Sequence, residues 1–277
     1  MNLVNEENIN QLFNLLNSKL KLKKLTSPSS SKGVENYLKN KVKSYGNKNP
    51  EIHKAFKTVL KPNPLYKSLT HKEKFILGIK CLSFEYFDLK LLGSNIMGHI
   101  YKNVTKEEFR TLNKTISTKN IINEWATSDC LTSKFYKFYG LLSKENTKEI
   151  ANLSKENNLW LRRISCVSFV NRVKFNDQKP NFKGFIDLMF EICENNKVHE
   201  ERFNQLALGW LLREISVVEY ERYKQWMKEN ISYMTREAVR YSIEKITPKQ
   251  KRLILSYFVC ENDDKKTNKT NSKKKQE

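Results

Sequence analysis

The stretch His199–Val218, HEERFNQLALGWLLREISVV, indicates how this chain folds. Several of its apolar residues recur at helical spacing and would form one stripe: Leu208, Leu211, Leu212, Ile215 and Val218. Others would form a second face, which also carries Arg213: Phe203, Leu206, Trp210 and Val217. A helix that is apolar on two sides packs between layers of other helices, so this stretch predicts an all-α architecture.

The same helical spacing extends over nearly the whole chain. Three stretches begin with helix-start signals: Thr70 with Glu73, Thr105 with Glu108, and Thr247 with Pro248 and Gln250. No stretch alternates apolar and polar residues in the manner of a strand. We expect about a dozen or more helices of ~10–18 residues joined by short loops. Successive helix pairs of similar length favour a solenoid of helical hairpins.

Composition divides the chain into three predicted segments. Residues 1–31 would form an amphipathic helix and a polar linker, because the stretch KLTSPSSSKG (Lys24–Gly33) breaks the apolar pattern. Residues 32–260 would form a single helical domain. Residues 261–277 are polar and rich in lysine, and we expect a disordered tail there.

The formal net charge of +21 is the strongest global signal. The lysine-rich tail contributes little of it, because six lysines there are offset by four acidic residues. A folded body this basic favours a polyanionic partner, above all nucleic acid. The alternative is codon bias, since abundant Lys and Asn are what an AT-rich genome produces.

Other classes of protein are disfavoured. No apolar run approaches the about 18 residues that span a bilayer, and the N-terminal stretch lacks the features of a signal peptide. The five cysteines are scattered without a CxxC pair, so we expect no zinc site and mostly buried, reduced thiols in an intracellular protein. The phosphate-binding and serine-hydrolase signatures GxxxxGK[ST], GxGxxG and GxSxG are missing from the sequence.

The stretch NEWATSD (Asn123–Asp129) could carry chemistry, because Trp125 and Asp129 would share one helix face. Phosphates repel a carboxylate, so a DNA binder has little reason to keep one in its groove unless it is used. One use is to stabilise the cationic sugar formed when an N-glycosidic bond breaks. A tryptophan ring suits such a site because it attracts a cationic base through a cation–π contact. Alternatively, Ser128 or Asp129 caps the helix that begins at CLTSKFYKFYG, and Trp125 is ordinary core.

Two arginines are candidate phosphate ligands. Arg163 follows Trp160 by three residues, and Arg213 follows Trp210 by three residues. A guanidinium fork matches phosphate oxygens. Each arginine could instead serve in a surface ion pair, and Arg213 could pair with a glutamate of an adjacent helix.

At these residues the sequence resembles the AlkD-like family of DNA alkylation repair enzymes, over about residues 34–246. Six stretches carry the resemblance in order: YLKNKVKSYGNKNPE (Tyr37–Glu51), EYFDLKLL (Glu85–Leu92), NEWATSD, NLWLRRISCVSFV (Asn158–Val170), QLALGWLLREI (Gln205–Ile215) and MTREAVRYSIEK (Met234–Lys245). The resemblance implies a HEAT-like α–α superhelical solenoid with a concave, basic DNA-binding face. The chain departs from the family pattern at Leu206, where a basic residue is frequent.

The resemblance also implies an activity and a site. The protein would be a monofunctional glycosylase that removes N-alkylated purines such as 7-methylguanine and 3-methyladenine from double-stranded DNA. It would act as a monomer, without metal, cofactor or membrane, in the bacterial nucleoid or a eukaryotic nucleus. Asp129 would be the catalytic carboxylate, and the residues at the lesion or the DNA would be Trp125, Trp210, Arg163, Tyr37, Arg213 and Lys48.

Two alternatives remain from the residues themselves. A non-catalytic DNA-binding scaffold on the same fold would bind DNA with a steep dependence on salt, and Asp129 would be only a cap. A HEAT-like protein-interaction module whose charge reflects codon bias would not bind DNA at ~0.1 M salt.

Overall fold

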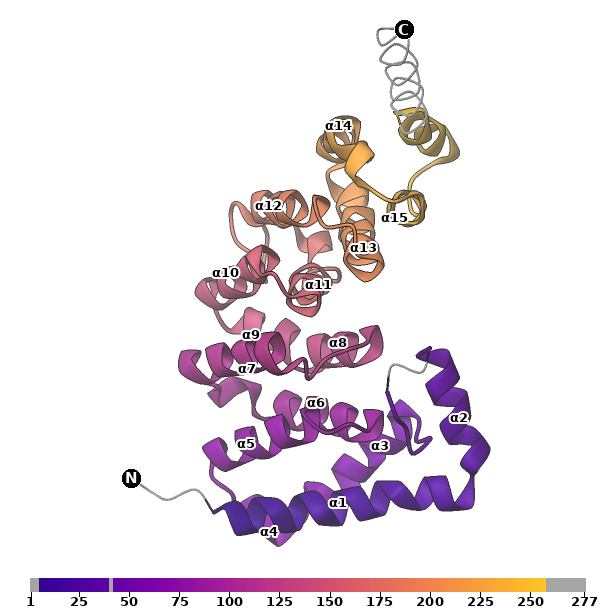
Figure 1. Ribbon diagram of the computed structural model, residues 1–277. Helices are drawn as coiled ribbons and strands as arrows, with labels where there is room; N and C mark the ends of the chain where they lie inside the picture. The colour runs from indigo at the N-terminus through magenta and orange to yellow at the C-terminus, as the bar shows by residue number, and fades with distance from the viewer. Residues whose placement is uncertain (1–4, 40–41, 258–277) are drawn as a thin grey trace, which may run out of the picture. The chain divides into compact units, whose positions relative to one another are not determined.

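The computed structural model describes residues 5–39 and 42–257, and within these ranges the protein is all-α (Figure 1). Fifteen labelled α-helices are joined by short turns, and the one extended pairing among these residues is an isolated bridge between Lys43 and Tyr86. The all-α prediction is therefore confirmed. The chain divides into two compact units, Met1–Thr147 and Lys148–Glu277, which are described separately.

The described residues of unit 1 form nine α-helices and the start of a tenth. Their bounds are α1 Glu6–Thr26, α2 Pro28–Tyr37, α3 Asn49–Ala55, α4 Pro64–Ser68, α5 His71–Leu82, α6 Phe87–Ile100, α7 Lys106–Lys119, α8 Trp125–Leu131, α9 Lys137–Leu142 and α10 Lys144–Asn152. A π-helical turn at Phe56–Leu60 continues α3, and another at Thr132–Tyr136 joins α8 to α9. These turns and the short α4 explain why several helices are shorter than the predicted ten residues.

Helix α6 lies at the centre of unit 1 and packs against α1, α3, α5 and α8. Nearly all of its residues are buried. Its contact with α5 is a backbone contact, because a Cβ atom on Gly93 would lie 2.9 Å from the carbonyl oxygen of Gly78. Glycine at these two positions lets the helices approach closely and fixes α6 as the support for α8.

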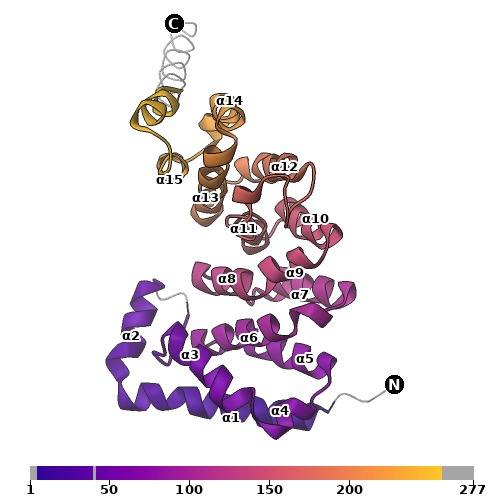
Figure 2. The same ribbon diagram turned by 180° about the vertical axis from the view of Figure 1, so that it is seen from behind.

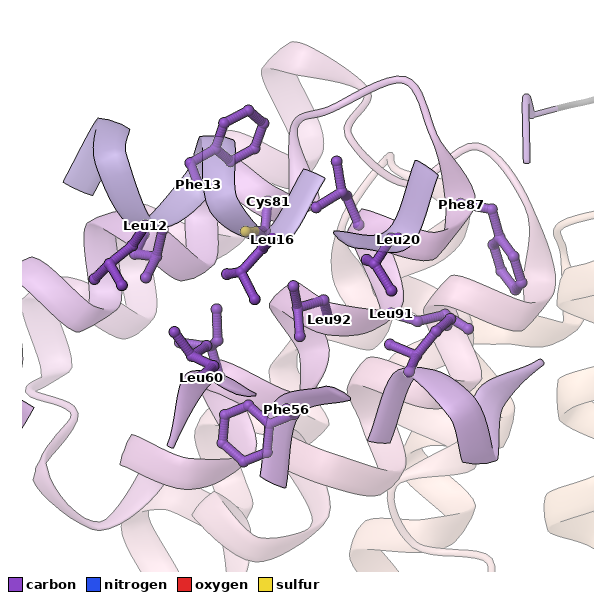
Figure 3. Close-up of a cluster of buried hydrophobic side chains, with 14 of the residues drawn as sticks. Leu12, Phe13, Leu16, Leu20, Phe56, Leu60, Cys81, Phe87, Leu91 and Leu92 are labelled. Atoms are coloured by element: carbon purple, nitrogen blue, oxygen red, sulfur yellow. The ribbon is translucent and has the colours of Figure 1, made fainter. Parts of the chain in front are cut away.

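The first helix belongs to the core of unit 1. Figure 3 shows side chains of α1 among those of α5, α6 and the π-helical turn after α3: Leu12, Phe13, Leu16 and Leu20 with Cys81, Leu91, Leu92, Phe56 and Leu60. The predicted polar linker at Lys24–Gly33 is wrong, because α1 runs to Thr26 and α2 begins at Pro28. Proline at the first position of a helix costs no hydrogen bond, so this proline starts a helix.

Unit 2 is organised around α13. Its helices are α11 Leu159–Val167, α12 Phe185–Lys197, α13 Arg202–Val218, α14 Tyr220–Asn230, α15 Arg236–Ser242 and a further helical stretch at 248–257. Helix α13 packs against α11, α12, α14 and α15, as expected for a helix that is apolar on two sides. The carbonyl oxygen of Ala238 on α15 would lie 2.6 Å from a Cβ on Gly209.

The two apolar faces of α13 are covered to different extents. The first stripe is buried at Leu208, Leu211, Leu212 and Ile215. On the second face Phe203, Leu206 and Trp210 are half-buried, and the side chain of Val217 is 59% exposed. Unit 2 therefore leaves part of an apolar and aromatic helix face open.

Local sequence signals are confirmed at the helix starts. Thr70 and Thr105 form capping boxes with Glu73 and Glu108, and Thr247 exchanges hydrogen bonds with Gln250. Four cysteines are buried and unpaired, and burial raises the pKa of each thiol: Cys81, Cys130, Cys166 and Cys193. Cys260 and the predicted tail at 261–277 lie outside the described residues. Among the residues that are described, no helix is long and apolar enough to cross a membrane.

Candidate functional site

The NEWATSD stretch forms the start of α8, and its cap is not the predicted one. The carboxylate of Glu124 accepts the backbone N–H of Thr127 at 2.8 Å, so Glu124 is the N-cap. Ser128 and Asp129 lie inside the helix, and the alternative in which either caps it is wrong. Asp129 is half-buried, one turn after Trp125 on the same face of α8.

Trp125 stands between the core and the surface of unit 1. Its half-buried ring packs against the large hydrophobic cluster on one side. On the other it meets Tyr37, at the end of α2, edge to face with ring centroids 5.6 Å apart. Tyr37 is 67% exposed. The structure thus brings together Tyr37, Trp125 and the helix that carries Asp129, and leaves an aromatic ring open to solvent.

A buried lysine holds the segment in front of α8, and the sequence reasoning did not identify it. Lys90 on α6 is 4% exposed, and its Nζ donates hydrogen bonds to the carbonyl oxygens of Leu82 at 3.0 Å and Ile121 at 2.6 Å. Burial lowers the pKa of Lys90 to about 8, an effect that nearby Glu124 partly opposes. Burial likewise raises the pKa of Glu124. The signal in the sequence that could have identified Lys90 is its place within the apolar stretch EYFDLKLL.

A cavity of about 550 Å³ adjoins this segment in unit 1. Its lining includes Glu35 of α2, Lys90 of α6 and Asn123, which precedes α8. Charges of both signs face it, and at its edge Lys43 pairs with Glu85 at 2.6 Å. The cavity therefore has polar walls beside the segments that carry Tyr37 and Trp125.

The stretches Tyr37–Glu51 and Glu85–Leu92 meet at one buried carboxylate, that of Asp88. Asp88 on α6 accepts hydrogen bonds from the Ser44 hydroxyl at 2.9 Å, the Tyr45 backbone N–H at 2.8 Å, and the backbone and side-chain N–H groups of Asn47 at 2.9 and 2.7 Å. The exposed Lys48 follows directly, and its backbone N–H donates to Glu51 at 2.7 Å. Asp88 thereby fixes the backbone that presents Lys48.

The remaining candidates lie in unit 2. Arg163 on α11 is only 5% exposed, and its Nη1 donates to the carbonyl oxygen of Phe203 at 2.9 Å. Arg213 on α13 forms ion pairs with Glu244 at 2.6 Å and with Glu214 at 3.2 Å. The predicted pairing of Arg213 with a glutamate is therefore present, with Glu244 just after α15. Both guanidinium groups have partners within the protein.

Trp210 lies on the half-open face of α13. The centroid of its ring is 6.3 Å from that of Tyr241 on α15 and 5.8 Å from the Arg213 guanidinium. Its indole N–H is buried and has no hydrogen-bond partner among the described residues. The structure thus brings Trp210, Arg213 and Tyr241 together in unit 2. Arg163 of α11 meets Phe203 nearer the start of α13.

These features define an all-α protein built from packed helix pairs, with aromatic and charged groups gathered on partly open helix faces. The chain belongs to the DNA alkylation repair enzyme family, whose sequence profile matches residues 18–246. Membership assigns the protein a role in DNA repair.

One solved structure matches the fold over most of its length. It is described as "Predicted DNA alkylation repair enzyme from Enterococcus faecalis", with a TM-score of 0.66 and 20% sequence identity. The match covers 80% of this chain and 97% of that one. At this identity the likeness concerns the fold alone. No curated protein matches the sequence.

Proposed function

We propose that the protein is a monofunctional DNA glycosylase that hydrolyses the N-glycosidic bond of cationic N-alkylated purines in duplex DNA. Substrates of this kind include 7-methylguanine and 3-methyladenine. The fold would be a HEAT-like solenoid whose concave, basic face binds the duplex. Family membership and the net charge of +21 support a DNA substrate.

The observation that carries the proposal is the place of Asp129 in α8. It is not used as a cap, it is half-buried, and it lies one turn from a tryptophan whose ring meets a solvent-exposed tyrosine. A structural explanation for this acid by local capping is thereby removed. An acid on an aromatic face of a strongly basic protein is suited to a substrate that becomes cationic.

The chemistry follows from the charge of the substrate. An alkylated purine already carries a positive charge, so it leaves as a neutral base and needs no general acid. As the bond from the sugar C1′ to the base breaks, positive charge develops on the sugar, and the Asp129 carboxylate stabilises it. Water then attacks C1′ and passes a proton to the carboxylate or to solvent. Neither a metal nor an organic cofactor takes part in this scheme.

The binding roles follow the residue types. Trp125 and Tyr37 would contact the lesion nucleotide, since aromatic faces attract cationic bases. Trp210, on the half-open face of α13, would also contact the lesion nucleotide through its ring. Arg163, Arg213 and Lys48 would bind phosphate.

The test measures release of 7-methylguanine from N-methylated duplex DNA by the wild type and by Asp129→Asn. We expect release by the wild type and loss of most of it in the variant, with folding unchanged by circular dichroism. Asp187→Asn is the matched control, because Asp187 is an exposed acid on α12. DNA binding without release by the wild type would indicate a non-catalytic scaffold. Neither binding nor release at ~0.1 M salt would indicate a protein-interaction module.

A further inference from the structure

A second cavity of unit 1, of about 280 Å³, lies where the start of α5 meets the end of α6. We name it the α5–α6 cavity. The junction of α4 and α5 lies at the side of unit 1 opposite to α2, as both views show (Figures 1 and 2). The cavity is therefore separate from the Tyr37–Trp125 pair. Its lining residues are His71, Lys74, His99, Ile100, Lys102 and Asn103.

The lining supplies hydrogen-bond donors and positive charge. Two lysines, two imidazoles and one amide face the cavity, and no carboxylate is among the lining residues. Two acids near α5 have partners of their own. Glu108 on α7 pairs with Nε2 of the lining residue His71 at 3.0 Å, and Glu73 accepts the backbone N–H groups of Thr70 and Asn5, each at 2.8 Å. A lining with two lysines and no carboxylate favours an anion.

The pKa of His99 reflects the positive charge close to the cavity. Its Nδ1 lies 3.1 Å from the Tyr66 hydroxyl, which holds the ring in place. Burial lowers the pKa of His99, and Lys61 and Lys74 lower it further. The Lys74 ammonium is itself held 5.3 Å from the centre of the Tyr66 ring. Positive charge on Lys61 and Lys74 thus acts on an imidazole whose protonated form a bound anion would favour.

We propose that the α5–α6 cavity is a binding site for a phosphate group. Lys74 and Lys102 supply the charge, while the His99 imidazole and the Asn103 amide supply directed donors. The volume of about 280 Å³ holds several water-sized groups and so has room for a phosphate and the first atoms of an ester. The phosphate can come from free phosphate or from DNA, and the experiment separates the two.

The experiment follows the imidazole Cε1–H resonance of His99 by NMR in the full chain. The chain has only four histidines, so a His99→Gln variant assigns the signal. Inorganic phosphate is titrated against chloride at equal ionic strength, and the pKa of His99 is measured with and without phosphate. We expect a saturable shift and a higher pKa with phosphate. No saturable shift with either phosphate or DNA would overturn the proposal.

Matched variants test the site itself. Lys74→Ala/Lys102→Ala should weaken binding about tenfold or more, since charge-assisted hydrogen bonds are lost. Lys67→Ala/Lys72→Ala removes the same charge from exposed positions outside the lining and should bind as the wild type does. Equal weakening in both double variants would overturn the proposal, because binding would then depend on net charge alone.

Titration with three different ligands identifies the source of the phosphate. Inorganic phosphate is compared with one duplex that ends in 5′-phosphate and with the same duplex ending in 5′-hydroxyl. Saturation by inorganic phosphate alone identifies a free-anion site. A response to both duplexes identifies a backbone contact, and a response to the phosphorylated duplex alone identifies an end-binding site.

Discussion

The Nζ atom of Lys90 lies 2.6 Å from the carbonyl oxygen of Ile121, and this hydrogen bond ties α6 to the segment that leads into α8. The buried ammonium group of Lys90 therefore helps to position α8, the helix that carries Trp125 and Asp129. Its second bond, to Leu82, also satisfies a carbonyl at the end of α5.

Replacing Lys90 by methionine keeps the apolar stem but leaves two buried carbonyl groups without a donor. We expect the free energy of unfolding to fall by roughly 1–3 kcal/mol, measured by urea denaturation. Base release should fall as well, because α8 loses its anchor. Lys114→Met, on the exposed side of α7, is the control and should change neither quantity.

The stability difference between wild type and Lys90→Met should also depend on pH. Because the pKa of Lys90 is lowered from 10.5 to about 8 on folding, the unfolded chain binds more protons between these values. The wild type should therefore gain stability relative to the variant as pH rises from about 8 to 10.5. A difference that stays flat across this window, measured by urea denaturation at each pH, would contradict the assigned burial of the ammonium.

Two glycine-to-alanine substitutions should act in opposite directions. Gly209→Ala places a Cβ 2.6 Å from the Ala238 carbonyl oxygen and should destabilise the protein by about 1–3 kcal/mol. Gly33→Ala, inside α2, meets nothing within 4 Å and should stabilise it by about 0.5–1 kcal/mol. Urea denaturation of both variants checks the signs, and a stabilising Gly209→Ala would show that α13 and α15 lie further apart.

Removing the ring of Tyr37 should affect substrate handling more than folding. Loss of an aromatic contact with a base costs about 1–3 kcal/mol, so Tyr37→Ala should lower kcat/KM for base release roughly tenfold. The free energy of unfolding should fall by only about 1 kcal/mol, the worth of the ring pair with Trp125. Tyr37→Phe keeps the ring and should behave as the wild type. Equal losses in both variants would assign the role to the hydroxyl.

Removing one of the two acids that pair with Arg213 should strengthen DNA binding. Glu244→Gln removes the carboxylate that accepts from Arg213 Nη1 at 2.6 Å, so that Nη1 becomes available to phosphate while Glu214 still accepts from Nε. We expect a lower Kd and a plot of log K against log salt that steepens by about 0.9, the value for one more phosphate contact. Glu237→Gln, which breaks the exposed pair with Arg202, corrects for the change in net charge. Identical effects of the two substitutions would show that Arg213 does not contact DNA.

The positions of most helices could be predicted from the sequence, because the signals for helix formation are local. Apolar spacing and the Thr70 and Thr105 caps depend on residues three or four positions apart, and the structure has them as expected. The stretch after Lys24 resembles a linker because of its serines, but Pro28 stands at the first position of α2, where its missing N–H costs no hydrogen bond.

The geometry of the candidate site was harder to predict, because it depends on contacts between residues that are far apart in the sequence. Glutamate is not a favoured cap, yet Glu124 caps α8 where α6 places Lys90 nearby. The spacing of Arg163 from Trp160 gave no sign that Phe203, forty positions further on, would supply a carbonyl acceptor. The roles of Asp129, Trp210 and the other site residues stay predictions for the experiments above.

Asp88 has a consequence for the thermodynamics of DNA binding. Its carboxylate holds the backbone from Ser44 to Asn47 in one conformation before any partner arrives. A segment held in one conformation in advance loses little conformational entropy in the proposed contact between Lys48, at its end, and a phosphate. The ordering cost of this contact is met during folding, so Asp88→Asn should make DNA binding at this segment entropically less favourable even where the contacts themselves are unchanged.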